Sequence, residues 1–311
     1  MTSRQKDYPL AQFGGETPPR PGWFADALEI PCEKIPLVHD GARIELLAWG
    51  ERGKPGLLLQ HGNRAHVHWW TPVAATLSDR FRVAAISPSG MGASDWREHY
   101  SVRGYGGELM AAANAAGLFD AGPPVFVGHS FGTGPVLSAA QHYGKQFAGI
   151  ILADTRIVEN MPKFDIGQAP RHRIYPDLAT ALSRFRLAPT QPCENLYYLD
   201  WIARHALREV PVNEAGGPGW TWRFDPTQWD KLEDIDRWAA ATQTNCPMAM
   251  IFGERSSVLE PGYLDGLKAH MPAGTRFEII PDAAHHLMLD QPLAVTEAIG
   301  RIASGMIADR T

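Results

Sequence analysis

Long apolar runs, paired cysteines and an excess of charge of one sign are all missing from this sequence. No uninterrupted apolar stretch reaches the ~18 residues of a membrane span. Residues 1–21 contain charges, adjacent glycines and prolines, but no apolar segment of the kind that a signal peptide needs. The three cysteines, Cys32, Cys193 and Cys246, are scattered and odd in number. We therefore expect reduced thiols and a cytoplasmic location rather than a disulfide framework.

The charge balance argues against two classes of partner. The chain has 29 Lys and Arg against 34 Asp and Glu, a net charge of -5, and no basic stripe. Neither nucleic acid nor an anionic membrane is favoured by such a surface. With 311 residues, 44% of them hydrophobic, the chain can bury a sizeable core. A small-molecule substrate is the expected partner, and the sequence leaves open whether the protein forms a homo-oligomer.

Buried-strand patterns alternate with helical patterns in the first half of the chain and again near its end. Asp40-Gly41 between two strand-like runs predicts a hairpin. Such alternation predicts an α/β fold with a mostly parallel central sheet and helices on both faces. The expected strands are 33–38, 42–49, 57–60, 82–86, 124–127, 149–153, 248–252 and 276–280, and the expected helices are 68–78, 103–118, 133–143, 261–270 and 292–304.

Between residues 156 and 240 the alternation stops, and five of the ten tryptophans gather there. We interpret this stretch as a helical lid, or cap, inserted into an α/β core made of residues 28–155 and 241–311. Residues 1–27 are predicted to be an N-terminal arm without a core of its own. Most of the lid aromatics are expected to pack on each other, with Trp222 our candidate for contact with substrate.

Residues 128–132 read Gly-His-Ser-Phe-Gly, and their neighbours give this common pattern its meaning. A buried strand precedes them and a small-residue helix follows. A strand, a serine flanked by glycines and a helix make a nucleophile elbow, in which the serine hydroxyl projects from a tight turn. We predict that Ser130 is a nucleophile rather than a serine that caps a helix.

Four segments in this order resemble the α/β-hydrolase fold family, and the resemblance covers residues 30–305. They are His61-Gly62-Asn63-Arg64 after the strand 57–60, Ser-Pro-Ser-Gly-Met-Gly-Ala-Ser-Asp at 87–95, the elbow, and Pro-Asp-Ala-Ala-His-His-Leu at 281–287. With serine at the elbow, the chain resembles the serine hydrolases of the family. The dehalogenases and epoxide hydrolases of the family carry aspartate at that position.

The resemblance implies a histidine base in the late loop and backbone donors for an oxyanion. His285 matches the base, with His286 as the alternative if the register is shifted by one. The amide of Phe131 and that of Asn63 are the implied oxyanion donors, with Arg64 as the alternative to Asn63.

Other polar residues near these motifs are assigned to substrate binding or packing. His61, Gly62, Arg64 and His129 are expected to line the substrate side of the site. His66 and His68 form His-x-His, but no partner cluster with zinc-type spacing accompanies them. We therefore predict neither a metal nor a cofactor.

The sequence departs from the family pattern at the position of the acid that would orient the histidine. The resemblance implies an aspartate after the strand 248–252, yet positions 256 and 257 are both serine. Asp154, at the end of the strand 149–153, is our preferred replacement because strand ends converge at that edge. Glu254, Glu260, a Ser-His dyad and, less comfortably, Asp282 stay open.

These residues predict a serine hydrolase of the carboxylester hydrolase type. It would cleave a carboxylic ester of a small apolar or aryl substrate through an acyl-enzyme on Ser130. Two alternatives stay open: a hydrolase that cleaves a carbon–carbon bond with the same serine and histidine, and a ligand receptor that keeps the fold without hydrolysis.

Overall fold

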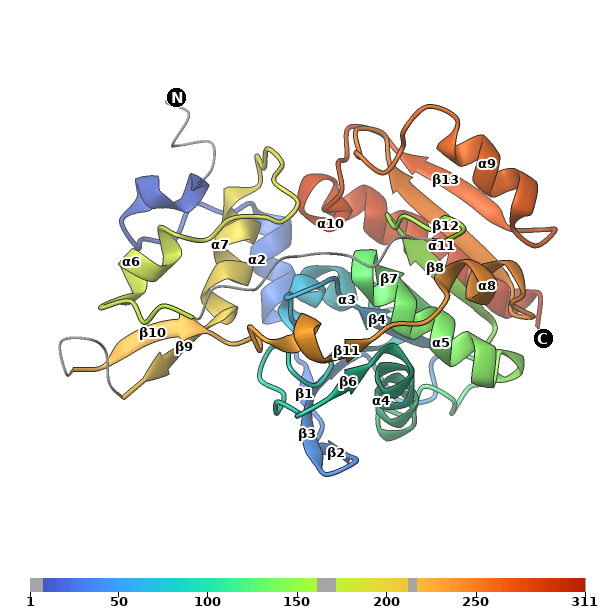
Figure 1. The fold of residues 1–311 in the computed structure, drawn as a ribbon, viewed down its shortest axis with the longest axis horizontal. Helices are drawn as coiled ribbons and strands as arrows, with labels where there is room; N and C mark the ends of the chain where they lie inside the picture. Colours follow the sequence, from blue (N-terminus) through green and yellow to red (C-terminus); the bar gives the residue numbers. More distant parts are fainter. Residues whose placement is uncertain (1–7, 161–171, 212–216, 311) are drawn as a thin grey trace.

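A central sheet of nine strands organises the molecule in the computed structural model, which describes residues 8–160, 172–211 and 217–310 (Figure 1). The strand order is β1-β3-β5-β4-β7-β8-β12-β13, with β2 paired to β3. The strands from β5 to β13 in this order run parallel, and β1, β2 and β3 form an antiparallel edge. The predicted, mostly parallel α/β sheet is confirmed. The strands are β1 (Glu33–Lys34), β2 (Leu37–His39), β3 (Ala42–Trp49), β4 (Gly56–Gln60), β5 (Arg82–Ser87), β7 (Val125–His129), β8 (Gly149–Ala153), β12 (Met248–Gly253) and β13 (Arg276–Ile280).

The predicted hairpin is also confirmed. Asp40 and Gly41 connect β2 to β3, and both have positive φ, 45° and 76°. Two consecutive left-handed residues give the two-residue turn whose twist matches that of the flanking strands.

Helices cover both faces of the sheet, as predicted. Successive strand residues point to opposite faces, so Leu57 and Leu59 enter one apolar cluster and Leu58 enters the other. All three are fully buried, and each such side chain contributes roughly 1.5–3 kcal/mol. The first cluster is covered by α3 (Thr71–Leu77) and α11 (Pro292–Ala308), and the second by α4 (Val102–Ala115), α5 (Thr133–Tyr143), α8 (Arg237–Thr242) and α9 (Tyr263–His270).

The N-terminal segment packs onto this core. Leu10 in the 3₁₀ helix η1 (Pro9–Phe13) and Phe24 in α2 (Gly22–Glu29) are buried in the same cluster as the sheet residues. Helix α2 continues past the arm boundary predicted at residue 27, and residues 1–7 lie outside the described part of the chain.

The segment predicted as a helical lid also contains short, partly exposed strands, which the sequence did not predict. β9 (Leu207–Val210) and β10 (Gly219–Trp222) form a hairpin apart from the central sheet, and β11 (Leu232–Glu233) pairs with β6 (Tyr100–Ser101). Only two to four residues long, these strands give too little alternation to be recognised. The helical parts are α6 (Leu178–Leu182), α7 (Leu196–His205) and the 3₁₀ helix η5 (Gln228–Lys231).

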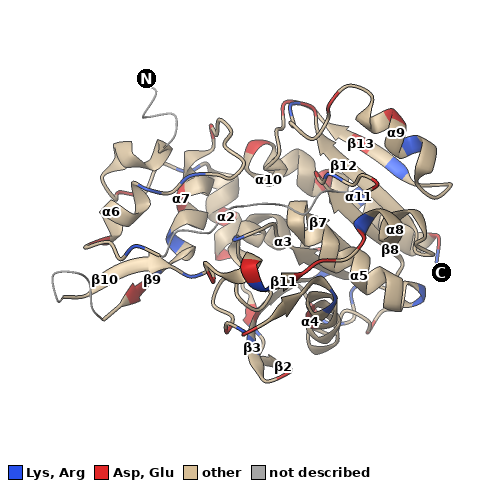
Figure 2. Ribbon diagram, in the orientation of Figure 1, with Lys and Arg blue, Asp and Glu red and all other residues tan. Residues whose placement is uncertain are grey.

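Figure 1 shows α6, α7 and the hairpin gathered beside the sheet, near η1 and α2. Residues 161–171 and 212–216 of the predicted lid lie outside the described residues, and the lid role stays a prediction. In Figure 2 acidic and basic residues are interspersed along the ribbon. Among the described helices, none has the length and apolar character needed to cross a membrane.

Candidate active site

The elbow lies where β7 passes into α5 through the 3₁₀ helix η3 (Ser130–Gly132). Ser130 has a φ of 54°, a left-handed conformation that costs energy for any residue with a side chain. A Cβ on Gly128 would lie 2.5 Å from the carbonyl oxygen of Gly132, and one on Gly132 would collide with the carbonyl oxygen of His61. Both glycines are therefore required for the close approach that turns the serine outward.

The hydroxyl of Ser130 lies against a histidine and a carboxylate from two other loops. Its Oγ is 3.0 Å from Nε2 of His285, and Nδ1 of His285 is 2.8 Å from Oδ1 of Asp154. A carboxylate accepts, so Nδ1 carries the proton and Nε2 keeps a lone pair for the serine hydroxyl. His285 is 8% exposed and Asp154 0%. This is the geometry of a nucleophile, a general base and an orienting acid.

Asp154 is held by two further donors. It follows β8 with a φ of 44°, and its Oδ2 accepts from the amide of Gly253 at 2.8 Å. The hydroxyl of Ser256 donates to Oδ1 at 2.6 Å. The loop after β12, where the resemblance implies an aspartate, thus supplies a donor to a carboxylate that comes from the neighbouring strand.

The other acids considered from the sequence are engaged elsewhere. Glu254 accepts from the backbone amide of Asp282 at 3.0 Å, and the carboxylate of Asp282 pairs with Arg255. Glu260 pairs with Arg156 at 3.0 Å. All three acids have exposed side chains, so the structure does not bring them to His285.

His286, the alternative base, makes no hydrogen bond with Ser130 among the described residues. Its backbone amide donates to the side chain of Gln191 at 2.9 Å, and its Nε2 lies 3.3 Å from the carbonyl oxygen of Pro189. Its ring packs 5.2 Å from that of Trp69. Burial lowers the pKa of His286 well below its ordinary value, which keeps the ring neutral.

The two implied oxyanion donors lie on either side of the elbow. Phe131 is in the first turn of η3, where an amide has no acceptor within the helix. Asn63 is the third residue after β4, and within residues 8–160, 172–211 and 217–310 no acceptor is found for its amide. Arg64, the alternative, has a φ of 53° and its guanidinium lies 5.3 Å from the ring of Phe224 in the predicted lid.

Trp229 is a site neighbour that sequence reasoning missed. Its indole Nε1–H donates to Oδ1 of Asn63 at 2.9 Å, and its ring lies 5.2 Å from that of Phe131. A residue of the predicted lid thus contacts both residues expected to supply oxyanion donors. Trp222, which the sequence favoured, packs 6.0 Å from Tyr175 and from Phe185 instead. Their spacing in the sequence does not show which of the two tryptophans contacts the elbow, because that contact forms only in the folded protein.

Three of the residues predicted to line the substrate side, His61, Gly62 and His129, are buried against the elbow. A Cβ on Gly62 would lie 3.3 Å from Cβ of Ser130 and from Nδ1 of His129. His129 donates from Nε2 to the carbonyl oxygen of His285 at 2.8 Å, and His61 donates from Nδ1 to that of Gly62 at 2.8 Å. Burial lowers the pKa of His61 to about 4, and burial together with His285 lowers that of His129 to about 3. Both rings are neutral at pH 7 and brace the two loops.

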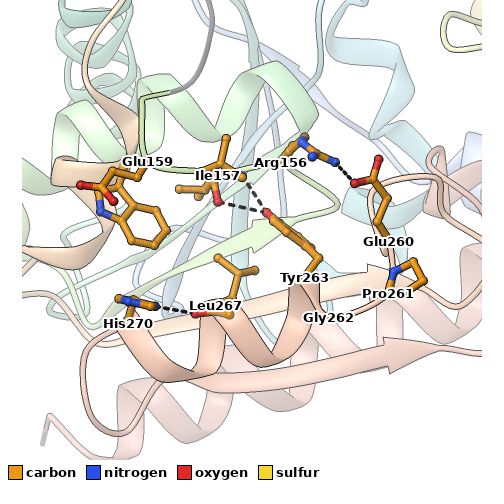
Figure 3. Close-up of a pocket in the computed structure, with 12 residues that line it drawn as sticks. Arg156, Ile157, Glu159, Glu260, Pro261, Gly262, Tyr263, Leu267 and His270 are labelled. Carbon is orange, nitrogen blue, oxygen red and sulfur yellow. Dashed lines mark hydrogen bonds and ion pairs between the residues drawn. The ribbon is translucent and has the colours of Figure 1, made fainter.

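A separate cleft of about 300 Å³ is lined by residues 156–159 and by residues of α9 (Figure 3). None of Ser130, Asp154 and His285 lines it. The hydroxyl of Tyr263 in α9 accepts from the amide of Ile157 at 2.7 Å and donates to the carbonyl oxygen of Thr155 at 3.1 Å. These contacts brace the chain that leaves Asp154, so the cleft borders the site without containing its reactive groups.

The family follows from comparison with known proteins. The model of the alpha/beta hydrolase family matches residues 57–298, so the chain belongs to that family. No curated protein matches the sequence.

Solved structures with the same fold include a thioesterase domain, an esterase and another hydrolase. The thioesterase domain from the curacin biosynthetic pathway is 24% identical with a TM-score of 0.69, over 86% of this chain and 99% of that one. A thermophilic esterase from Thermogutta terrifontis is 22% identical with a TM-score of 0.65, over 89% and 99%. E-2-(acetamidomethylene)succinate hydrolase is 18% identical with a TM-score of 0.66, over 87% and 98%. At these identities the likeness shows the fold alone.

Proposed function

We propose that this member of the alpha/beta hydrolase family is a serine hydrolase that cleaves carboxylic esters through an acyl-enzyme on Ser130. One observation carries the proposal: His285 stands between Ser130 and Asp154, 3.0 Å from the hydroxyl and 2.8 Å from the carboxylate. A serine hydroxyl is a weak nucleophile at neutral pH, and this arrangement supplies the base it needs. This alignment argues against a ligand receptor without hydrolysis.

In the first half of the reaction Oγ of Ser130 attacks the ester carbonyl carbon while Nε2 of His285 takes the hydroxyl proton. The negative charge that develops on the carbonyl oxygen is stabilised by the amides of Asn63 and Phe131. The tetrahedral intermediate collapses, and His285 returns the proton to the departing alcohol. Asp154 stabilises the imidazolium and keeps the ring in the working tautomer.

In the second half water replaces the alcohol. His285 takes a proton from the water, whose oxygen attacks the acyl carbon, and then returns the proton to Ser130 Oγ as the acid leaves. Ester and thioester bonds both suit this sequence, and the esterase and thioesterase among the structural neighbours are compatible with it.

The side chains around the proposed oxyanion hole favour an apolar or aryl substrate. The rings of Phe131 and Trp229 lie 5.2 Å apart beside Ser130, and aromatic walls of this kind bind apolar groups. We infer that the lid residues near Trp229 select the acyl or alcohol group.

The test is turnover of nitrophenyl esters of increasing acyl length, with one diketone included for carbon–carbon cleavage. Ester turnover by the wild type, abolished in Ser130→Ala, is the expected result. Turnover of the diketone but of no ester would favour the carbon–carbon hydrolase. Absence of turnover for every compound, with no covalent labelling by a fluorophosphonate, would contradict hydrolysis.

A further inference from the structure

We propose that His129, His285 and His286 form a capture site for a borderline transition-metal cation such as Zn²⁺, and that an ion held there inhibits the enzyme. The site itself is independent of the proposed function. Its effect on turnover rests on that function, because His285 is the proposed base.

The three rings already lie together. One nitrogen of each ring lies within 4.8 Å of one nitrogen of each other ring, the only such group of three or more His, Cys, Asp or Glu side chains within the described residues. The ring centroids are 5.0 Å apart for His129 and His285, 4.9 Å for His285 and His286, and 5.9 Å for His129 and His286. All three side chains are buried.

Two of these rings carry a buried nitrogen with nothing to bind. Nδ1 of His129 and Nδ1 of His286 have no hydrogen-bond partner among the described residues. A buried polar atom without a partner is costly and needs an explanation. The proposed catalytic sequence assigns no role to either atom.

The hydrogen bonds determine which atoms hold lone pairs. His129 and His286 each direct Nε2 at a carbonyl oxygen, so in a neutral ring Nε2 carries the proton and Nδ1 the lone pair. His285 directs Nδ1 at Asp154, which leaves its lone pair on Nε2. Each ring therefore presents one imidazole lone pair, the form that binds a metal.

The chemistry of this donor set selects the ion. Three imidazoles suit Zn²⁺, Cu²⁺ or Ni²⁺, whereas Ca²⁺ and Mg²⁺ prefer oxygen ligands. In a tetrahedral zinc site, bonds of about 2.0–2.1 Å place the nitrogens roughly 3.4 Å apart, so the rings must draw together slightly. The ring of His286 makes the longest of the three hydrogen bonds, 3.3 Å to the carbonyl oxygen of Pro189, against 2.8 Å for His129 and for the bond of His285 to Asp154. The carboxylate of Asp154 beside His285 offsets part of the ion's charge.

The first experiment measures binding without catalysis. Ser130→Ala keeps all three rings, so titration of this variant with Zn²⁺ by calorimetry, and with Co²⁺ by visible absorption, reports the site whether or not the protein hydrolyses esters. We expect one bound ion per chain and a tetrahedral Co²⁺ spectrum. No binding, or an octahedral Co²⁺ spectrum, would overturn the proposal.

Matched variants locate the ion. In the Ser130→Ala background, His286→Phe keeps an aromatic ring against Trp69 and His286→Asn keeps polarity, and each should weaken Zn²⁺ binding at least about tenfold. His205→Phe is the control, because His205 belongs to the other histidine cluster, with its ring 4.0 Å from that of His68. Zn²⁺ affinity that falls in His205→Phe but not in the folded His286 variants would overturn the proposal.

Turnover then tests the inhibition. Zn²⁺ should inhibit ester hydrolysis by the wild type, a chelator should reverse it, and His286→Phe should hydrolyse esters while resisting Zn²⁺. Equal inhibition of wild type and His286→Phe would assign the inhibitory ion to another site and contradict the proposal.

Discussion

The hydroxyl of Ser256 donates a 2.6 Å hydrogen bond to Oδ1 of Asp154, the same oxygen that faces Nδ1 of His285. Two neighbouring parallel strands, β8 and β12, end side by side, so a carboxylate on either loop can reach the same ring. In this chain the carboxylate follows β8, and the loop after β12 contributes a hydrogen-bond donor to it.

Replacing Asp154 should therefore damage catalysis more than folding. Asp154→Asn keeps the volume of the side chain but favours the tautomer of His285 that has no lone pair for Ser130. In serine proteases such a change costs on the order of 10⁴ in turnover, and we expect a loss of that order here. The measurement is kcat on one nitrophenyl ester, with folding checked by circular dichroism.

Glu254→Gln is the matched control, because its carboxylate binds the amide of Asp282 on the exposed side of the same loop. Its kcat should stay within about twofold of the wild type. If folded Asp154→Asn kept a kcat within about threefold of the wild type, the barrier would differ by only ~0.7 kcal/mol. That result would contradict a catalytic role for Asp154.

The contact with Ser256 predicts which position can restore the acid. In the Asp154→Asn background, Ser256→Asp should recover part of the lost turnover, because the side chain of residue 256 is buried against residue 154. Ser257→Asp should recover none, since residue 257 is exposed. Turnover of the two double variants on the same ester distinguishes these outcomes. Rescue by position 257 alone would show that the loop turns differently from the structure.

Trp229 should act on the transition state through Asn63. Trp229→Phe keeps the ring against Phe131 but removes the indole N–H that Asn63 accepts. One lost hydrogen bond is worth about 1 kcal/mol, so kcat should fall roughly fivefold with little change in KM. Trp222→Phe is the control, because Trp222 in β10 packs near Tyr175 and Phe185 instead. This change should leave kcat unchanged. A larger effect of Trp222→Phe on kcat would reverse the assignment.

Patterns within a few residues of each other were sufficient to predict the sheet and the elbow, whereas the late histidine loop came from the family resemblance. Strands such as β8 and β13 have the predicted bounds because their apolar runs end at polar loop residues. Position at a strand end also favoured Asp154, since parallel strands bring their carboxyl ends to one edge, but it left Glu254, Glu260 and Asp282 open.

Orientation of side chains across the fold could not be predicted in this way. Ser256 and Ser257 are equivalent in sequence, and only the turn after β12 buries one and exposes the other. Of the two tryptophans Trp229 and Trp222, only Trp229 contacts Asn63, and this contact joins segments far apart in the sequence. Tertiary packing, not local pattern, decides these cases.

The buried histidines predict loss of stability in acid. His61 and His129 have pKa values of about 4 and about 3 in the folded protein, against 6.5 ordinarily. Below pH 6.5 the unfolded chain binds protons that the folded chain does not, so the free energy of unfolding falls as pH falls. Each ring contributes a slope of about 1.4 kcal/mol per pH unit until its folded pKa is reached. Asp290, whose pKa burial raises to about 6, gives an opposing slope between its ordinary 3.8 and 6.

Urea unfolding followed by tryptophan fluorescence between pH 7 and pH 5 measures this dependence. His129→Asn should flatten the slope, because it removes one of the buried rings. A free energy of unfolding that does not change over this range would contradict the neutral, buried state of these rings.

The covalent intermediate on Ser130 is tested most directly by mass spectrometry after reaction with a fluorophosphonate. The account predicts one adduct per chain in the wild type, mapped by peptide analysis to Ser130. Ser130→Ala should take up no adduct, and Asp154→Asn should react far more slowly because its His285 cannot accept the proton. An adduct on another residue, or undiminished labelling of folded Ser130→Ala, would contradict the assignment of Ser130 as the nucleophile.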